Sequence, residues 1–134
     1  IRDLDSSLVG SEMCIRDRHD TNRMQIKKDQ AMRRLRKASE SFLTLFEHGS
    51  LQLEIYKPDK VDLQTPHDRD EVYVVISGSG EFLNGKGRVD FGPGDFLFVP
   101  AGVEHRFVNF TDDFSTWVIF YGPVGGEEQV LKEQ

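Results

Sequence analysis

The chain has 134 residues, of which 37% are hydrophobic, and this size and composition suit one small domain with a single core. Its formal net charge is −6, which argues against a general nucleic-acid-binding role, because phosphate contacts need clustered Lys and Arg side chains. A single cysteine excludes an intramolecular disulfide, and no apolar run reaches the roughly 18–20 residues that span a bilayer. We therefore expect a cytoplasmic protein without membrane contacts.

One helix is predicted near the start of the chain. Within residues 24–40, Ala31, Leu35 and Ala38 recur at helical spacing, and basic side chains occupy the remaining surface. A basic surface could bind a membrane or an acidic partner, but a solvated face is the simpler interpretation. We assign residues 19–41 to an N-terminal helix that packs on the rest of the domain through its apolar side.

From residue 42 onward, apolar residues alternate with polar ones, which is typical of half-buried β-strands. Asn84-Gly85 predicts a tight turn between two paired strands, because both residues tolerate positive φ. Gly and Pro residues separate short strands, which we expect at residues 51–56, 71–77, 81–83, 88–91, 96–99, 105–110 and 114–121. The pattern predicts an all-β sandwich or barrel over residues 42–123, followed by a polar tail at 124–134.

Two patterns place histidines among charged and turn-forming residues. The first runs from Thr65 to Glu71 as TPHDRDE and is followed after six residues by Gly78. The second begins at Gly94 and continues with Pro100, Gly102, His105 and Asn109. Together they resemble the two motifs of the cupin superfamily, except that Thr65 stands where the family usually has a further histidine. The resemblance covers about residues 43–122 and implies a small single-domain cupin, a jelly-roll barrel also described as a double-stranded β-helix.

The resemblance implies a site for one divalent metal ion, and the residue types fit this role. His67 and Glu71 are four residues apart, so on an extended strand they would share a face, and His105 would approach from another strand. Two imidazoles and one carboxylate suit Fe, Mn, Zn or Ni and leave coordination positions open. We predict that these three residues bind the metal, with Thr65 outside the ligand set and water in its place.

Each predicted ligand also has a structural alternative. His67 could be a surface turn residue, His105 could be a hydrogen-bonded core histidine, and Glu71 could form a salt bridge with Arg69 or Arg106. A carboxylate at the head of an apolar strand is costly to bury without a cation, which favours metal binding by Glu71.

The neighbouring side chains are assigned by alternation along the strands. Asp68 and Asp70 are expected to be solvated loop charges. Candidates for the pocket walls share a face with Glu71 or with His105, and they are Tyr73, Val75, Phe107 and Asn109. For the last strand, alternation leaves open whether residues 117, 119 and 121 or residues 118 and 120 point inward.

Two functions remain open at this point. The first is a metal-dependent enzyme, an oxygenase or an isomerase, that acts on a small organic molecule with Tyr73 as the catalytic acid or base. The second is a non-catalytic module that binds a sugar or another metabolite. The fold hosts both, so it does not decide between them. The open edges of a small barrel, together with the resemblance, also lead us to expect a homodimer.

The beginning of the chain differs from the rest. Residues 6–18, SSLVGSEMCIRDR, show no sustained period and resemble a translated sequencing adapter. We therefore expect residues 1–18 to be a non-native segment and Cys14 to have no role.

Overall fold

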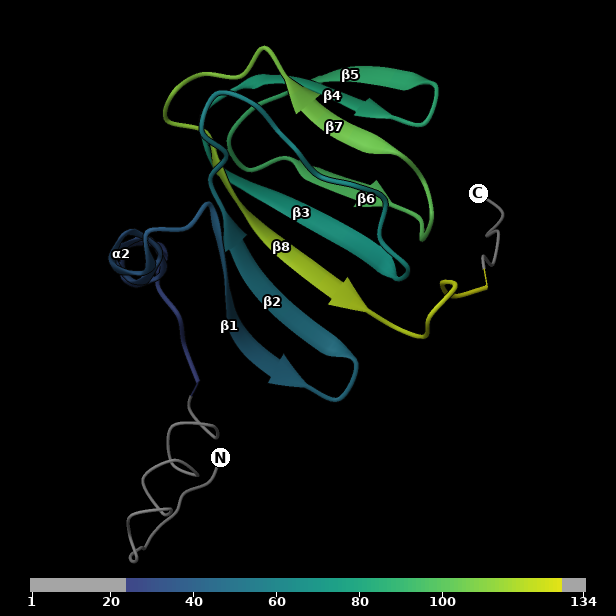
Figure 1. Cartoon of the computed structure of the whole chain (residues 1–134), viewed down its shortest axis with the longest axis horizontal. Coiled ribbons are helices and arrows are strands. Elements are labelled where there is room, and N and C mark those ends of the chain that lie inside the picture. Colours follow the sequence, from purple (N-terminus) through teal and green to yellow (C-terminus); the bar gives the residue numbers. More distant parts are fainter. Residues whose placement is uncertain (1–23, 129–134) are drawn as a thin grey trace, which may run out of the picture.

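The structure is a computed structural model, and it describes residues 24–128. The expectations for residues 1–18, for Cys14 and for the end of the tail lie outside these residues. The described part of the chain contains one helix and eight strands (Figure 1), namely α2 (Lys28–Ala38), β1 (Phe42–His48), β2 (Leu51–Tyr56), β3 (Asp70–Ser77), β4 (Gly80–Asn84), β5 (Gly87–Phe91), β6 (Phe96–Val99), β7 (His105–Val108) and β8 (Ser115–Tyr121). Within these residues, no helix has the length and apolar character that a membrane span requires.

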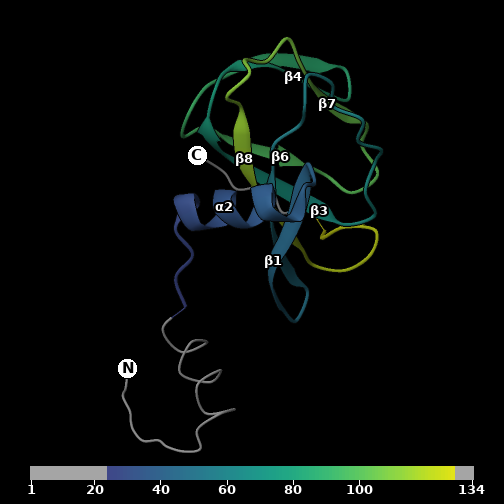
Figure 2. The ribbon, with the colours of Figure 1, turned by 60° about the vertical axis from the view of Figure 1, so that its left-hand side comes forward.

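Helix α2 forms where the sequence predicts one, but residues 24–27 before it and 39–41 after it are not helical, and residues 19–23 of the predicted helix lie outside the described part of the chain. Asp29 in its first turn and Arg36 and Lys37 in its last turn complement the helix dipole. It ends at Ser39, which adopts a left-handed conformation with φ 59° and donates its backbone N–H to the Leu35 carbonyl over 3.1 Å. Figure 2 shows the helix lying across β1. It belongs to the same packed unit as the strands.

The strands form two antiparallel sheets, as a jelly roll requires. One sheet has five strands in the order β1-β2-β8-β3-β6, and the other has three in the order β5-β4-β7. Aromatic side chains from both sheets pack together between them, including Tyr73, Phe82 and Phe107, which are at most 1% exposed. The predicted all-β jelly-roll fold is confirmed.

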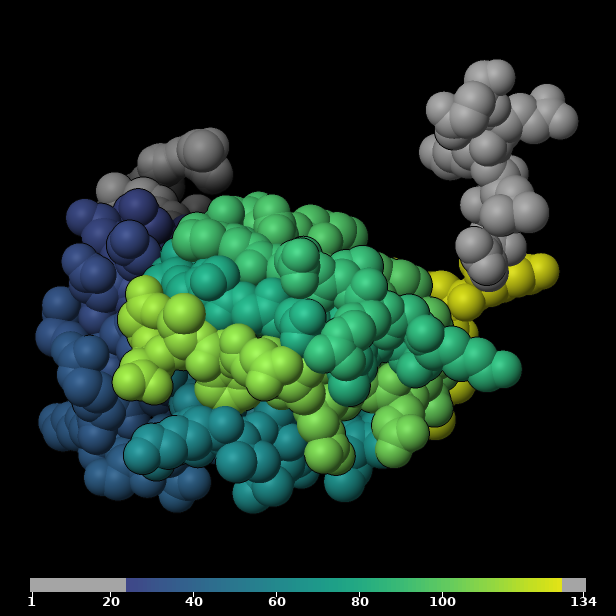
Figure 3. All heavy atoms as spheres, turned by 90° about the horizontal axis from the view of Figure 1, so that it is seen from above, coloured from purple at the N-terminus to yellow at the C-terminus, as the bar shows by residue number. Residues whose placement is uncertain are grey.

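The two faces of strand β2 have different surroundings. One face packs into a second apolar core, and the other lines a pocket. Ile55 and Leu53 pack with Leu35 of α2 in a second apolar cluster on the outside of the large sheet. Gln52 and Glu54 point to the opposite side and line a pocket. The polar face of this strand is therefore the interior face, and its apolar face is covered by the helix. Figure 3 shows α2 and β1 gathered at one side of the molecule, with the segment after β8 at the other.

Several strand boundaries differ from the sequence prediction. The β4–β5 hairpin forms as expected, but Asn84 pairs with Gly87, so the turn residues are Gly85 and Lys86. Only Gly85 of these two has positive φ, at 61°, as at the first position of a type II′ turn. Strand β7 ends at Val108 because Asn109 is left-handed, with φ 52°.

Gly78 shows why the first motif ends in a glycine. Its φ is 84°, and a Cβ atom at this position would lie 2.4 Å from the Cα of Phe114. The chain can leave β3 and pass this close to the segment before β8 only without a side chain.

Candidate metal centre

The structure brings together the three residues that the sequence predicts as metal ligands. One ligand atom from each of His67, Glu71 and His105 lies within 4.8 Å of the others, in a group that could hold a metal ion. His105 Nε2 is 3.2 Å from Glu71 Oε1, and His67 Nε2 is 3.9 Å from the same oxygen. We call this group the His-Glu-His cluster.

The cluster combines three different segments. Glu71 is the second residue of β3, where it pairs with Val99 of β6 and Phe120 of β8, and His105 is the first residue of β7. His67 does not lie on a strand, because β3 begins only at Asp70. The alternation argument that placed His67 and Glu71 on one extended strand was therefore wrong, although the two side chains do meet.

Other contacts hold His67 in place. The backbone N–H of Gly102 donates to the His67 carbonyl over 2.7 Å. Close by, Asp70 accepts hydrogen bonds from the backbone N–H groups of Ala101 (2.9 Å) and Glu127 (2.8 Å). Asp70 is only 4% exposed, so its prediction as a solvated loop charge was wrong. Its carboxylate fastens the loop that carries His67 to the turn before His105.

Hydrogen bonding orients the His105 ring. Its Nδ1 lies 3.0 Å from the carbonyl of Val103, which can only accept, so Nδ1 carries a proton and donates it. Nε2 therefore faces Glu71. Burial lowers the pKa of His105, but the contact with Glu71 and the Val103 carbonyl raise it more strongly, and the net pKa is above the ordinary value.

The cluster leaves buried polar atoms without partners. Among the described residues, both carboxylate oxygens of Glu71 and Nε2 of His105 are buried and lack a hydrogen bond. Neither arginine considered in the sequence analysis pairs with Glu71. Arg69 instead donates to the Ser50 carbonyl and to Gln52 Oε1, at 2.8 Å each. A buried carboxylate that has no hydrogen bond and only imidazole nitrogens nearby is unfavourable, and a cation bound between it and the imidazoles would satisfy all three atoms. The donor set therefore fits a divalent metal ion.

Sequence reasoning missed a buried carboxylate beside the cluster. Asp62 is 1% exposed, although it stands between exposed Val61 and Leu63. Its Oδ1 accepts from the Tyr56 hydroxyl (2.7 Å) and the Gln64 backbone (3.0 Å), and its Oδ2 accepts from the Phe107 backbone (2.8 Å) and the Gln64 side chain (3.0 Å). No alternation rule applies in this loop, so the sequence carried no signal for it.

Tyr73 lies in the core next to the cluster and is fully buried. Its hydroxyl donates to Gln64 Oε1 over 3.0 Å. Burial and the nearby charge of Glu71 raise its pKa well above the ordinary value, so the phenol stays protonated at neutral pH. Tyr73, Val75 and Phe107 belong to the apolar core between the sheets and are not among the residues that line the pocket, so their assignment to the pocket wall was wrong.

Asn109, by contrast, is exposed and donates to Glu81 Oε1 over 2.8 Å, so its assignment to the pocket wall was wrong. On β8, it is Val118 and Phe120 that face the pocket.

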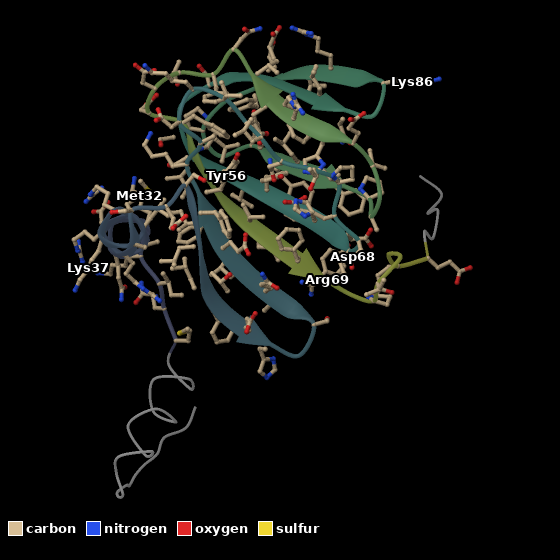
Figure 4. The ribbon with its side chains drawn as sticks, in the orientation of Figure 1. Met32, Lys37, Tyr56, Asp68, Arg69 and Lys86 are labelled. Carbon is tan, nitrogen blue, oxygen red and sulfur yellow. The ribbon has the colours of Figure 1, made fainter. Side chains whose placement is uncertain are left out.

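The cluster lies at a pocket of about 590 Å³ on the inner face of the large sheet. Figure 4 shows Asp68 and Arg69 together near the end of β8, and both residues line the pocket. Thr65 also lines it, but it is exposed and outside the cluster. Polar lining comes from β2 and the loop before β3, and apolar lining includes Phe42, Val118 and Phe120. The volume suits a small organic molecule.

Comparison with known families agrees with the fold and the motifs. Residues 52–121 match the family described as "Cupin domain". An uncharacterised protein of Streptomyces coelicolor is 32% identical over 85 residues, which make up 62% of this chain and 81% of that protein. The chain therefore belongs to the cupin-domain family.

Solved structures resemble the barrel at lower identity. A cupin 2 conserved barrel domain protein from Rhodopseudomonas palustris has a TM-score of 0.54 at 18% identity, covering 62% of this chain and 61% of that one. KdgF from Halomonas sp. has a TM-score of 0.54 at 20% identity, covering 60% and 76%. The match thus spans less than two thirds of the Rhodopseudomonas protein. At these identities the likeness shows the fold alone.

Proposed function

We propose that the protein binds one divalent metal ion through His67, Glu71 and His105 and uses its open coordination positions to engage a small organic molecule in the pocket. The observation that carries this proposal is the buried Glu71 carboxylate, which has no hydrogen-bond partner among the described residues and faces an imidazole nitrogen at 3.2 Å. Fe, Mn, Zn and Ni all accept such a donor set. When bound, the metal would supply Lewis-acid or redox chemistry.

The residues around the cluster have separate tasks in this proposal. His105 is held by the Val103 carbonyl, which would keep its Nε2 available to a bound ion. The polar residues Gln52 and Glu54 line the same pocket as the apolar Val118 and Phe120. A ligand with a polar end toward the metal and an apolar body would match both sets.

Of the two reaction classes considered, an oxygenase is favoured over an isomerase. Moving a proton along a substrate requires a base beside it. The Glu54 carboxylate in the pocket wall already accepts hydrogen bonds from Thr44 and Gln52, and Tyr73 stays protonated because burial raises its pKa. Its hydroxyl is engaged as a donor to Gln64. Oxygenase chemistry depends mainly on open metal positions, as in two-histidine-one-carboxylate sites.

A non-catalytic module that binds a sugar or another metabolite remains the second candidate. The observation that favours it is the polar wall of β2, where Gln52 donates to Glu54 Oε2 over 2.7 Å and accepts from Arg69 over 2.8 Å. Side-chain amides, carboxylates and guanidinium groups in this arrangement suit a ligand with many hydroxyl groups.

Metal content tests the site directly. The purified protein should carry about one metal ion per chain by elemental analysis, and alanine at His67, Glu71 or His105 should each reduce it, because three ligands leave no redundancy. His48→Ala is the matched control, since His48 is exposed at the end of β1. Full occupancy in His105→Ala would overturn the assignment.

Oxygen consumption separates the two functions. The Fe(II)-loaded protein should consume oxygen in the presence of one or more small organic acids or phenols, and His105→Ala should not. Calorimetric binding of a sugar without oxygen consumption or product formation would instead support the binding module.

A further inference from the structure

Gln64 lies beside the His-Glu-His cluster and takes no part in the proposed function so far. Its Oε1 is 3.4 Å from His67 Nε2. It also immediately precedes Thr65, the position at which the first motif lacks a histidine. The amide oxygen of Gln64 therefore lies beside one predicted ligand and comes from the segment in which a further ligand is missing.

The orientation of this amide is fixed by its neighbours. The Gln64 side-chain N–H donates to Asp62 Oδ2 and the Gln64 backbone N–H donates to Asp62 Oδ1, both over 3.0 Å. Because a carboxylate can only accept, the amide nitrogen must face Asp62 and the oxygen must face the cluster. Asp62 is itself held by Tyr56 and the Phe107 backbone, so it cannot easily turn away.

The oxygen retains capacity to bind a metal. A carbonyl oxygen has two lone pairs, and the Tyr73 hydroxyl uses one of them over 3.0 Å. The second faces His67 Nε2, which donates to it over 3.4 Å only when that nitrogen carries a proton, and a metal-binding imidazole nitrogen carries none. Two donor atoms that bind one ion at about 2.1 Å lie roughly 3.0–3.5 Å apart for angles between octahedral and tetrahedral. The 3.4 Å between Gln64 Oε1 and His67 Nε2 falls in this range, as does the 3.2 Å between His105 Nε2 and Glu71 Oε1, whereas the 3.9 Å between His67 Nε2 and Glu71 Oε1 exceeds it and would have to shorten on binding.

We propose that Gln64 Oε1 is the fourth protein ligand of the metal, in place of the water expected from the sequence. This inference rests on the proposed metal site. It gives a set of two nitrogen and two oxygen donors, which favours oxygen-preferring ions such as Mn²⁺ more than a site with a third imidazole would. Asp62 then acts as a positioning residue that keeps the amide oxygen turned toward the ion.

Variants at two adjacent pocket positions test the proposal. Gln64→Leu removes the oxygen at similar size, and it should weaken Mn²⁺ binding about 10- to 100-fold in a competitive titration with a chelator. Thr65→Val is the matched control, because Thr65 lines the same pocket outside the cluster. The Mn²⁺ affinity of this variant should stay within about twofold of that of the unaltered protein. The visible absorption spectrum of the Co²⁺-loaded protein should change in Gln64→Leu and stay unchanged in Thr65→Val.

A measurement on the unaltered protein covers the case in which Gln64→Leu does not fold. Zn²⁺, which is diamagnetic and acts mainly on atoms that it contacts, should shift the side-chain carbonyl carbon resonance of Gln64 far more than that of Gln52, which lines the same pocket. Two results would overturn the assignment of Gln64 as a ligand while leaving the three-residue site intact. One is an unchanged Mn²⁺ affinity together with an unchanged Co²⁺ spectrum in Gln64→Leu. The other is a similar resonance effect on both glutamines. Absence of metal binding by the unaltered protein would overturn the proposed site itself.

Discussion

The backbone N–H of Gly102 donates a 2.7 Å hydrogen bond to the carbonyl of His67, so the turn that leads into His105 also supports the other histidine. The two histidines come from distant parts of the chain, and this bond joins their segments directly. Gly102 has a φ of 80°, a conformation that side chains disfavour. Gly102, a glycine of the second motif, thus helps to position both histidines through its backbone.

Gly102→Ala should therefore destabilise the protein. A Cβ atom at Gly102 meets nothing within 4 Å, so the cost comes from the left-handed backbone and not from a collision. We expect a loss of about 1–2 kcal/mol in the free energy of unfolding of the metal-free protein, measured by urea denaturation. Metal affinity should fall as well, because His67 loses part of its support. Gly92→Ala is the control, since Gly92 has equally open space without positive φ, and equal stabilities of the two variants would contradict the explanation.

The raised pKa of His105 predicts opposite pH dependences with and without metal. A histidine whose pKa is raised by folding stabilises the folded state fully below its unfolded pKa, about 6.5, and this contribution is lost as pH rises through the folded pKa. The His105 contribution to the stability of the metal-free protein should therefore decrease over this interval. Metal affinity should increase over the same interval, because only a neutral imidazole binds the ion.

Thermal unfolding at a series of pH values, with a chelator or with excess metal, measures both trends. The difference between the unaltered protein and His105→Gln isolates the contribution of this histidine in the chelated state. A difference that grows with pH in the chelated state would show that His105 is not stabilised in its protonated form by Glu71.

The buried carboxylate of Asp62 should be important for stability. It accepts four hydrogen bonds, and Asp62→Asn replaces one accepting oxygen with an amide group that faces other donors. We expect a loss of about 2–4 kcal/mol in urea denaturation. Asp59→Asn, an exposed carboxylate in the same loop, should change stability by less than about 0.5 kcal/mol. Comparable losses in the two variants would contradict the structural role of Asp62.

The homodimer expected from the sequence has a candidate surface on the large sheet. Helix α2 covers the outer face near β1 and β2, whereas Phe96 and Phe98 on the edge strand β6 remain 65% and 41% exposed. We expect a dimer by light scattering, and Phe96→Glu combined with Phe98→Glu should yield monomers with unchanged metal content. A monomer at all accessible concentrations for the unaltered protein would contradict the expectation.

Sequence patterns predicted most of the fold because each signal was local. Alternation located β2 to β8, and Asn84-Gly85 located the β4–β5 hairpin to within one residue of its turn, but β1 was not among the expected strands. The helix was predicted too long, because the left-handed Ser39 that ends it is not a typical terminating residue such as glycine. Strand β7 was likewise predicted too long, because Asn109 turns left-handed where alternation would have continued.

The site was predictable only where a motif named its residues. The cupin resemblance predicted that His67, Glu71 and His105 form one site, and in the structure their ligand atoms lie close together. Asp62 was missed and Asp70 was misassigned, because they accept from the backbone of distant segments. Such partners become visible only when the sheets and the loop before β3 are packed together. Gln64 was missed although its partners are local, because it stands in an irregular loop to which no alternation or motif applies.

One face of β2 is covered by α2 and the other lines the pocket, and this arrangement determines where a fragment for expression can begin. The region matched to the family begins at residue 52 and so excludes α2 and all of β1. A fragment trimmed to that region would leave β2 as a bare sheet edge and expose Leu53, Ile55 and Trp117 to water. Such a surface promotes aggregation. The shortest fragment suited to expression therefore starts before α2, upstream of the point at which family resemblance begins.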